Sequence, residues 1–107
     1  MSFSVIYTEQ ARQNLHETHA YIHSVLLEPE TANKQLQRIM DAVNGLDHLP
    51  FRHRTYDVEP WRSKGWRIFP VDNFLIFYVP DEETTTVTIF RIIYAGRNIP
   101  AQLEQSE

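Results

Sequence analysis

Apolar residues follow two different periods in the first half of this 107-residue chain. Aromatic and branched side chains occupy every second position of segment 3–7, which predicts a short strand. Apolar residues then recur at three-to-four-residue intervals over 9–27, which predicts a helix, and Thr8 can cap its start. Segment 29–46 opens on a proline and carries a second apolar helical face, closed by Pro50. The short connection predicts an antiparallel helical hairpin.

The second half of the chain changes to the pattern of strands. Segment 51–64 is polar and aromatic without a clear period, and we expect a loop there. Three strands are predicted after it, over 66–71, 74–79 and 85–94, separated by Asp-Asn and by Pro-Asp-Glu-Glu turns. The connections are too short for crossovers, so the three strands should form an antiparallel meander.

The order β-α-α-β-β-β predicts a single α+β domain over residues 1–107. The apolar faces of the helical hairpin should cover one face of a mainly antiparallel sheet. Alternation in the last strand assigns its residues to opposite faces, with Val87, Ile89 and Ile93 on one and Phe90, Ile92 and Tyr94 on the other.

Composition narrows the class of protein. The chain has no cysteine, which excludes disulfides and thiolate chemistry. It has no apolar run long enough to span a bilayer and no signal-peptide pattern, so we expect a cytoplasmic protein that does not bind membranes. The net charge is −4, yet segment 52–67 carries five basic against two acidic side chains. Such a basic face suits either a polyanion or an acidic partner protein, and charge alone does not choose.

Four local strings, in this order along the chain, resemble the RelE/ParE toxins. They are Val5–Ala11, Pro60–Arg67, Asp72–Tyr78 and Ile92–Asn98. The resemblance covers almost the whole chain and agrees with the predicted element order. It implies a growth-inhibiting toxin of a type II toxin–antitoxin system, of the kind also called plasmid stabilisation proteins, which a cognate antitoxin neutralises.

The resemblance also suggests site residues. In the ribosome-dependent RNases of this family, the arginine of a Gly-aromatic-Arg string is catalytic or binds RNA phosphate, and the matching residue is Arg67. A second arginine after the last strand matches Arg97. Those enzymes add a tyrosine or histidine near the C-terminus, whereas segment 98–107 contains neither. This departure and the acidic net charge favour the ParE-like members, which poison DNA gyrase.

Cleavage of RNA by its own 2′-hydroxyl needs a base, an acid and positive charge for the transition state. Arg67 and Arg97 can supply the charge through bidentate contacts to phosphate oxygens. Tyr94 and His53 are the first candidates for proton transfer. The sequence also offers Arg54, Tyr56, Glu59 and Tyr78 within reach of such a site. The competing interpretation makes Tyr78 and Tyr94 core or rim aromatics with their hydroxyls at the surface.

Arg67 has a structural interpretation too, as a surface strand residue paired with Asp72 or Glu59. Candidate binding residues surround it in the sequence, and they are Arg54, Arg62, Lys64 and Trp66. Basic side chains interleaved with aromatic ones are typical of single-stranded nucleic acid binding. The alternative is a long loop held to the sheet by its aromatic residues, with its charges in solvent.

We expect no metal and no cofactor. His19 and His23 lie four apart on the first predicted helix, but the sequence suggests no third ligand. Three functions remain in order of preference: a gyrase poison, a metal-independent endoribonuclease that cuts messenger RNA on the ribosome with Arg67 and Arg97, and a non-toxic binding module. Both a homodimer and a toxin–antitoxin hetero-oligomer are compatible with the sequence.

Overall fold

The fold is known from a computed structural model, which describes residues 2–21, 27–95 and 99–103. Its elements are β1 (Ser4–Tyr7), α1 (Glu9–Ala20), α2 (Pro29–Asn44), the 3-10 turn η2 (Gly45–Asp47), β2 (Arg67–Val71), β3 (Phe74–Asp81), β4 (Thr86–Tyr94) and α3 (Ile99–Leu103). The predicted α+β class and the order β-α-α-β-β-β are confirmed. The short helix α3 was not predicted. The predicted first helix reached residue 27, and its segment 22–26 lies outside the described residues.

Both long helices begin where the sequence signals placed them. The Thr8 hydroxyl accepts a hydrogen bond from the Ala11 amide at 3.1 Å, as an N-cap does. The same hydroxyl donates to the Ile89 carbonyl at 2.9 Å, so the cap also fixes the start of α1 to β4. In α2, Pro29 occupies the first turn, where its missing N–H costs nothing.

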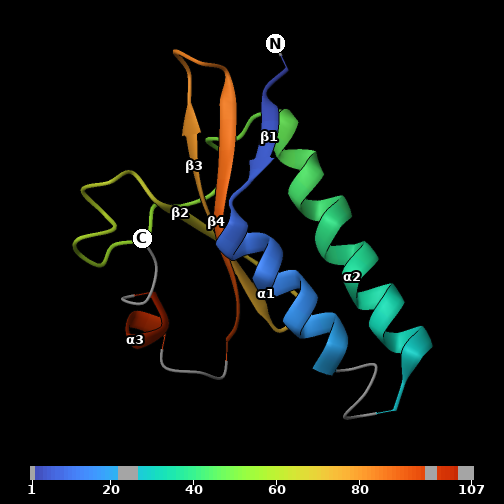
Figure 1. Cartoon of the computed structure of the whole chain (residues 1–107). Coiled ribbons are helices and arrows are strands. Elements are labelled where there is room, and N and C mark those ends of the chain that lie inside the picture. The colour runs from blue at the N-terminus through green and yellow to red at the C-terminus, as the bar shows by residue number, and fades with distance from the viewer. Residues whose placement is uncertain (1, 22–26, 96–98, 104–107) are drawn as a thin grey trace.

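The four strands form one sheet in the order β1-β4-β3-β2. The predicted antiparallel meander is confirmed, because β3 pairs antiparallel with both β2 and β4. β1 pairs parallel with β4 on the other side, which makes the sheet mixed. Figure 1 shows α1 and α2 side by side on one side of this sheet, with the 56–65 part of the long loop and α3 on the other.

A β-bulge changes the alternation that the sequence predicted for β4. Ile89 pairs with Tyr78 and Arg91 pairs with Phe77, so one extra β4 residue lies between two consecutive pairs. An extra residue reverses the alternation beyond it. Ile92 therefore joins Val87 and Ile89 under the helices, while Ile93 lies on the opposite face. The predicted places of Ile92 and Ile93 were wrong for this reason.

Each face of the sheet has its own apolar cluster. The first lies between the sheet and the helices, and its buried members include Ile39, Val43, Phe69, Tyr78 and Ile89. The second lies under the 51–65 loop and α3, and contains Tyr56, Trp61, Trp66, Phe77 and Leu103. The aromatic residues thus hold the loop to the sheet, which was the structural alternative for this segment.

Helix α1 also completes the hydrogen bonding of β4 beyond the end of β1. The side-chain oxygen of Asn14 accepts from the Ile92 amide at 3.1 Å and from Nε of Arg91 at 2.9 Å. Both Asn14 and Arg91 are buried, and burial lowers the pKa of Arg91. No described helix has the length and apolar character needed to cross a membrane.

Candidate functional site

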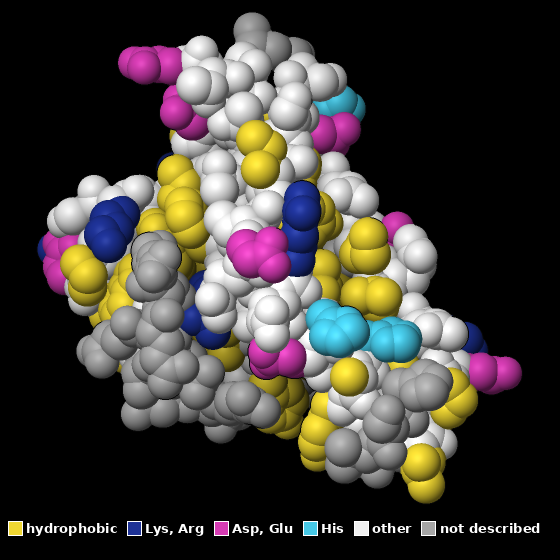
Figure 2. All heavy atoms as spheres, viewed as in Figure 1, with side chains coloured by type: hydrophobic (Ala, Val, Ile, Leu, Met, Phe, Trp, Pro, Cys, Tyr) yellow, Lys and Arg dark blue, Asp and Glu magenta, His cyan; other side chains and the backbone are white. Residues whose placement is uncertain are grey.

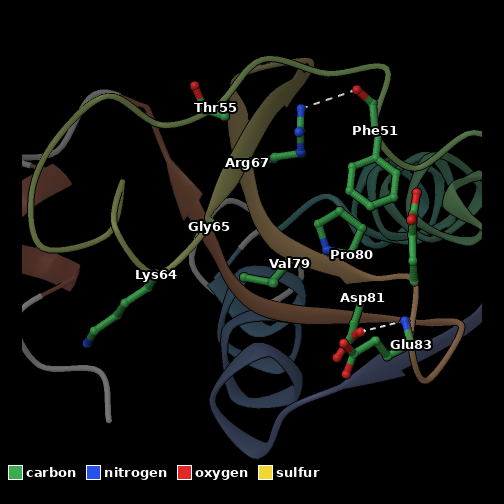
Figure 3. Close-up of a pocket in the computed structure, with 10 residues that line it drawn as sticks. Phe51, Thr55, Lys64, Gly65, Arg67, Val79, Pro80, Asp81 and Glu83 are labelled. Atoms are coloured by element: carbon green, nitrogen blue, oxygen red, sulfur yellow. Dashed lines mark hydrogen bonds between the residues drawn. The ribbon is translucent and has the colours of Figure 1, made fainter.

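A groove of about 560 Å³ lies between the long loop and the β3–β4 turn. The loop contributes Phe51, Thr55 and Lys64 to its lining, and β2 contributes Arg67. The far side of the groove is formed by Val79, Pro80, Asp81, Glu82 and Glu83. Figure 3 shows Phe51 and Pro80 between the guanidinium of Arg67 and the acidic side chains of Asp81 and Glu83.

Arg67 is held in this groove by contacts with the loop. Its Nη1 donates to the carbonyl oxygens of His53 at 2.6 Å and Phe51 at 3.2 Å. Its guanidinium carbon lies 5.1 Å from the centroid of the Phe51 ring, within the range of a cation–π contact. These contacts hold the loop against β2 and fix the orientation of the guanidinium.

The predicted ion pairs of Arg67 were wrong. Asp72 binds Arg38 instead, with 2.7 Å between its carboxylate and Nε. Glu59 binds Arg62, with 3.0 Å between carboxylate oxygen and Nη2. Hydrogen bonds from Ser63 and Arg62 lower the pKa of Glu59, and those from Arg38 and Gln35 lower the pKa of Asp72.

His53 lies beside Arg67, as predicted, but it is a stacked residue. Its ring lies 4.3 Å from the Phe69 ring at an angle of 12°. Burial, with a smaller effect of Arg52, lowers the pKa of His53, which favours the neutral imidazole at pH 7. Its carbonyl group, rather than its ring, contacts Arg67.

Tyr78 pairs with Arg67 across β2 and β3, yet its hydroxyl already has a partner. The side chain is completely buried, and the hydroxyl donates to the Pro50 carbonyl at 2.6 Å. Burial raises the pKa of Tyr78 to about 12. This tyrosine is therefore a core residue, and the expectation that its hydroxyl lies at the surface was wrong, because the hydroxyl is buried against the start of the loop.

Tyr94 does not join Arg67. It pairs with Phe74, and Phe74 pairs with Val71, four residues beyond Arg67 in β2. That offset places Tyr94 about 13 Å further along the strands, with β3 in between. Its ring packs edge-on against Phe74. Arg97, the second predicted arginine, lies outside the described residues.

The four predicted binding residues have different environments. Arg54 and Lys64 are exposed, and Lys64 extends away from Arg67. Arg62 is bound to Glu59. Trp66 is only 4% exposed, and its ring stacks on Phe90 at 5.0 Å, so this tryptophan is part of the core.

No group of three or more histidine or acidic side chains that could hold a metal occurs among the described residues. Nε2 of His19 lies 2.8 Å from the side-chain oxygen of Asn33. His23 falls in the segment that the structure does not describe. Histidines gather beside apolar side chains on the face shown in Figure 2, away from the loop.

Sequence reasoning missed the acidic side of the groove and the role of Phe51. Asp81 and Glu83 were assigned only to a turn, and Phe51 only to the set of loop aromatics that alternate with basic residues. Phe51 and Arg67 are 16 residues apart in the chain, and neither residue belongs to a periodic pattern that would connect them. No local signal in the sequence could have found this contact.

The fold and groove define a small α+β protein with a helical hairpin on one side of a mixed sheet and a long aromatic loop on the other. A family model described as the ParE toxin of type II toxin–antitoxin system, parDE, matches residues 5–99. The chain belongs to this family.

Two solved structures share the fold. One is a chain of the chromosomal ParDE toxin–antitoxin system from P. aeruginosa, with a TM-score of 0.71, 23% identity, and coverage of 87% of this chain and 96% of that one. The other is a chain of the toxin–antitoxin complex RelBE2 from Mycobacterium tuberculosis, with a TM-score of 0.62, 23% identity, and coverage of 88% and 92%. Among curated proteins none matches.

Proposed function

We propose that this protein is the growth-inhibiting toxin of a type II toxin–antitoxin pair, that it acts in the cytoplasm on DNA gyrase, and that a cognate antitoxin neutralises it. The match to the ParE family model supports the class of target, and the two similar structures belong to toxin–antitoxin systems. The whole chain, residues 1–107, acts as one domain in this proposal.

One observation carries the choice of gyrase over messenger RNA. The tyrosines and the histidine considered for proton transfer near Arg67 are not placed for that role. The Tyr78 hydroxyl is bound to Pro50, Tyr94 lies about 13 Å away along the strands, and the His53 ring stacks on Phe69. General acid–base catalysis requires a donor or acceptor within hydrogen-bond reach of the reacting group.

The second candidate is the metal-independent endoribonuclease with Arg67 and Arg97 in its site. One observation favours it: Arg67 is a hydrogen-bonded cation that lines a groove. In that mechanism the neutral ring of His53 would have to leave Phe69 and serve as the base. Loss of a stacking partner makes this arrangement less favourable than one in which the site needs no proton transfer.

The test begins with the purified protein and purified gyrase. Relaxed plasmid, ATP and gyrase are incubated with the protein, and both supercoiling and the appearance of linear DNA are measured. We expect supercoiling to fall and cleaved DNA to accumulate. An antitoxin from a neighbouring reading frame should restore supercoiling.

The same protein is then induced in a bacterial host, and DNA and protein synthesis are pulse-labelled in parallel. We expect DNA synthesis to fall first. Arg67→Gln is compared with Arg12→Gln, a matched loss of one positive charge on the exposed side of α1. If protein synthesis falls first and only Arg67→Gln restores it, the endoribonuclease assignment replaces ours. If neither synthesis falls, the protein is a non-toxic binding module.

A further inference from the structure

The two sides of the groove carry opposite charges. Arg67 lies on one side, while Asp81, Glu82 and Glu83 at the β3–β4 turn lie on the other. Phe51, Val79 and Pro80 give the groove an apolar floor between them. Arg67 pairs with Tyr78 in β3, and Asp81 is three residues further along this strand. The two charged sides are therefore roughly 10 Å apart at the backbone.

Arg67 is prepared to bind a single anion. Both hydrogen bonds to the loop carbonyls come from Nη1, and the Phe51 ring covers part of the guanidinium. Its Nε–Nη2 edge has no hydrogen-bond partner among the described residues. This edge is one of the planar forks through which arginine binds a carboxylate or a phosphate with two parallel hydrogen bonds. Because the guanidinium is already oriented, less side-chain entropy is lost on binding.

The acidic side of the groove distinguishes between a carboxylate and the phosphates of a nucleic acid. A nucleic acid brings several phosphates, spaced closely enough that the neighbours of a bound phosphate approach Asp81 and Glu83. At physiological salt, charges interact over roughly 8 Å, so such neighbours would be repelled. Lys64 does not offset this repulsion, because its side chain extends away from Arg67. A ligand that carries a carboxylate followed by a cation is instead attracted on both sides of the groove, by Arg67 and by the acidic turn.

We propose that this groove is a docking site for an extended polypeptide segment of a partner protein, one that carries an acidic residue for Arg67, an apolar residue for the Phe51–Pro80 floor and a basic residue for the acidic turn. An extended chain advances about 3.3 Å per residue, so the acidic and basic residues of the segment should be roughly two to four positions apart. The inference does not depend on the proposed function, since it concerns this groove and holds for any cellular target.

The test selects ligands without assuming one. A random dodecapeptide phage library is selected on the immobilised full-length protein, and enriched peptides are synthesised and measured by isothermal titration calorimetry. A fluorescein-labelled ten-nucleotide oligouridine RNA is the competing probe, measured by fluorescence anisotropy. We expect peptides with an acidic, an apolar and a basic residue in the stated spacing, and weaker binding of the RNA.

Three variants locate the contacts. Arg67→Gln should weaken the selected peptides by about tenfold or more, since a charge-assisted bidentate contact contributes that much. Glu83→Lys should weaken peptides with the basic residue and strengthen the RNA, because it removes repulsion from the acidic side. Glu83 is exposed, and its one hydrogen bond to the described residues runs from its backbone amide to Asp81, so this variant tests the groove even if Arg67→Gln disturbs the loop. Arg12→Gln should change neither.

Several outcomes would overturn the proposal. One is a selection that enriches nothing, or that enriches peptides without an acidic residue. Another is equal binding of the selected peptides to Glu83→Lys and to the unaltered protein. A third is RNA that binds more tightly than the peptides and depends on Arg67, which would make the groove a nucleic-acid site. None of these results bears on gyrase inhibition, so failure here is distinguishable from failure of the proposed function.

Discussion

The buried hydroxyl of Tyr78 makes a prediction about stability that depends on pH. Tyr78→Phe removes one oxygen atom and leaves the packing of the ring in the first cluster unchanged. At pH 7 the variant loses the 2.6 Å hydrogen bond to the Pro50 carbonyl, inside a completely buried site. A buried carbonyl that is left without its hydrogen-bond donor costs about 1–3 kcal/mol of stability. We expect the free energy of unfolding to fall by this amount.

The alkaline range gives the sharper test. The pKa of Tyr78 rises from 10.0 to about 12 because burial disfavours the phenolate. The neutral phenol therefore contributes its full stability below pH 10, and this contribution is lost as pH rises from 10 to 12. Two pKa units correspond to about 2.7 kcal/mol, of which about 1.4 kcal/mol is lost by pH 11.

Urea unfolding of both proteins at pH 7, 9, 10 and 11, followed by tryptophan fluorescence, measures this directly. The two proteins share every other tyrosine, so the difference between the two free energies isolates Tyr78. That difference should shrink by about 1.4 kcal/mol between pH 7 and pH 11. A difference that stays constant would show that the hydroxyl is not held as the structure describes. Under the proposed function, Tyr78→Phe should still inhibit growth.

Four further variants test the fold through thermal or urea unfolding. Asn14→Ala should cost about 3 kcal/mol, because two buried β4 donors lose their acceptor, and a loss under 1 kcal/mol would contradict the role given to this amide. Leu49 has a left-handed φ of 48° and is 77% exposed, so Leu49→Asn should stabilise by about 0.5–1 kcal/mol. Trp66→Ala should cost about 3–5 kcal/mol of stability, because its ring is part of the core. Arg62→Ala, in an exposed ion pair, should change stability by less than about 0.5 kcal/mol. Similar losses for both variants would be inconsistent with the core position of Trp66.

The sequence could predict the helices and the meander because their signals are local. The hydroxyl of Thr8 lies three residues from the amide it caps, and Pro29 acts through its own ring. The turn at Asp72 is equally local, since a residue type that tolerates a positive φ stands where the chain needs one. Such features require no knowledge of the rest of the fold.

The sequence could not predict the two faces of β4, because its bulge arises from pairing with β3. Nothing in the β4 sequence marks the extra residue, and strict alternation misplaced Ile92 and Ile93. The short helix α3 could not be predicted for a related reason. It is five residues long, too short for a helical period, and Leu103 is buried only because the second cluster lies beneath it.

The charged residues of the candidate site show the same limit of prediction from sequence. Segment 52–67 predicted a basic face, yet the fold uses much of that charge internally. Arg52 donates to the carbonyls of His48 and Leu49, Arg62 binds Glu59, and Arg67 donates to two loop carbonyls. A count of basic residues cannot distinguish cations that hold a loop from cations that face a ligand.

This use of charge bears on what the protein can bind. The dependence of binding on salt reports how many phosphates are neutralised, with a slope near −0.7 per contact for a single strand. A face built from all five cations of the segment would give a slope of about −3 or steeper. If Arg67 binds one phosphate and the acidic turn repels the phosphates next to it, any residual RNA binding should show a slope smaller than about 1 in magnitude. The arrangement of these arginines, more than their number, therefore favours a protein ligand over a polyanion.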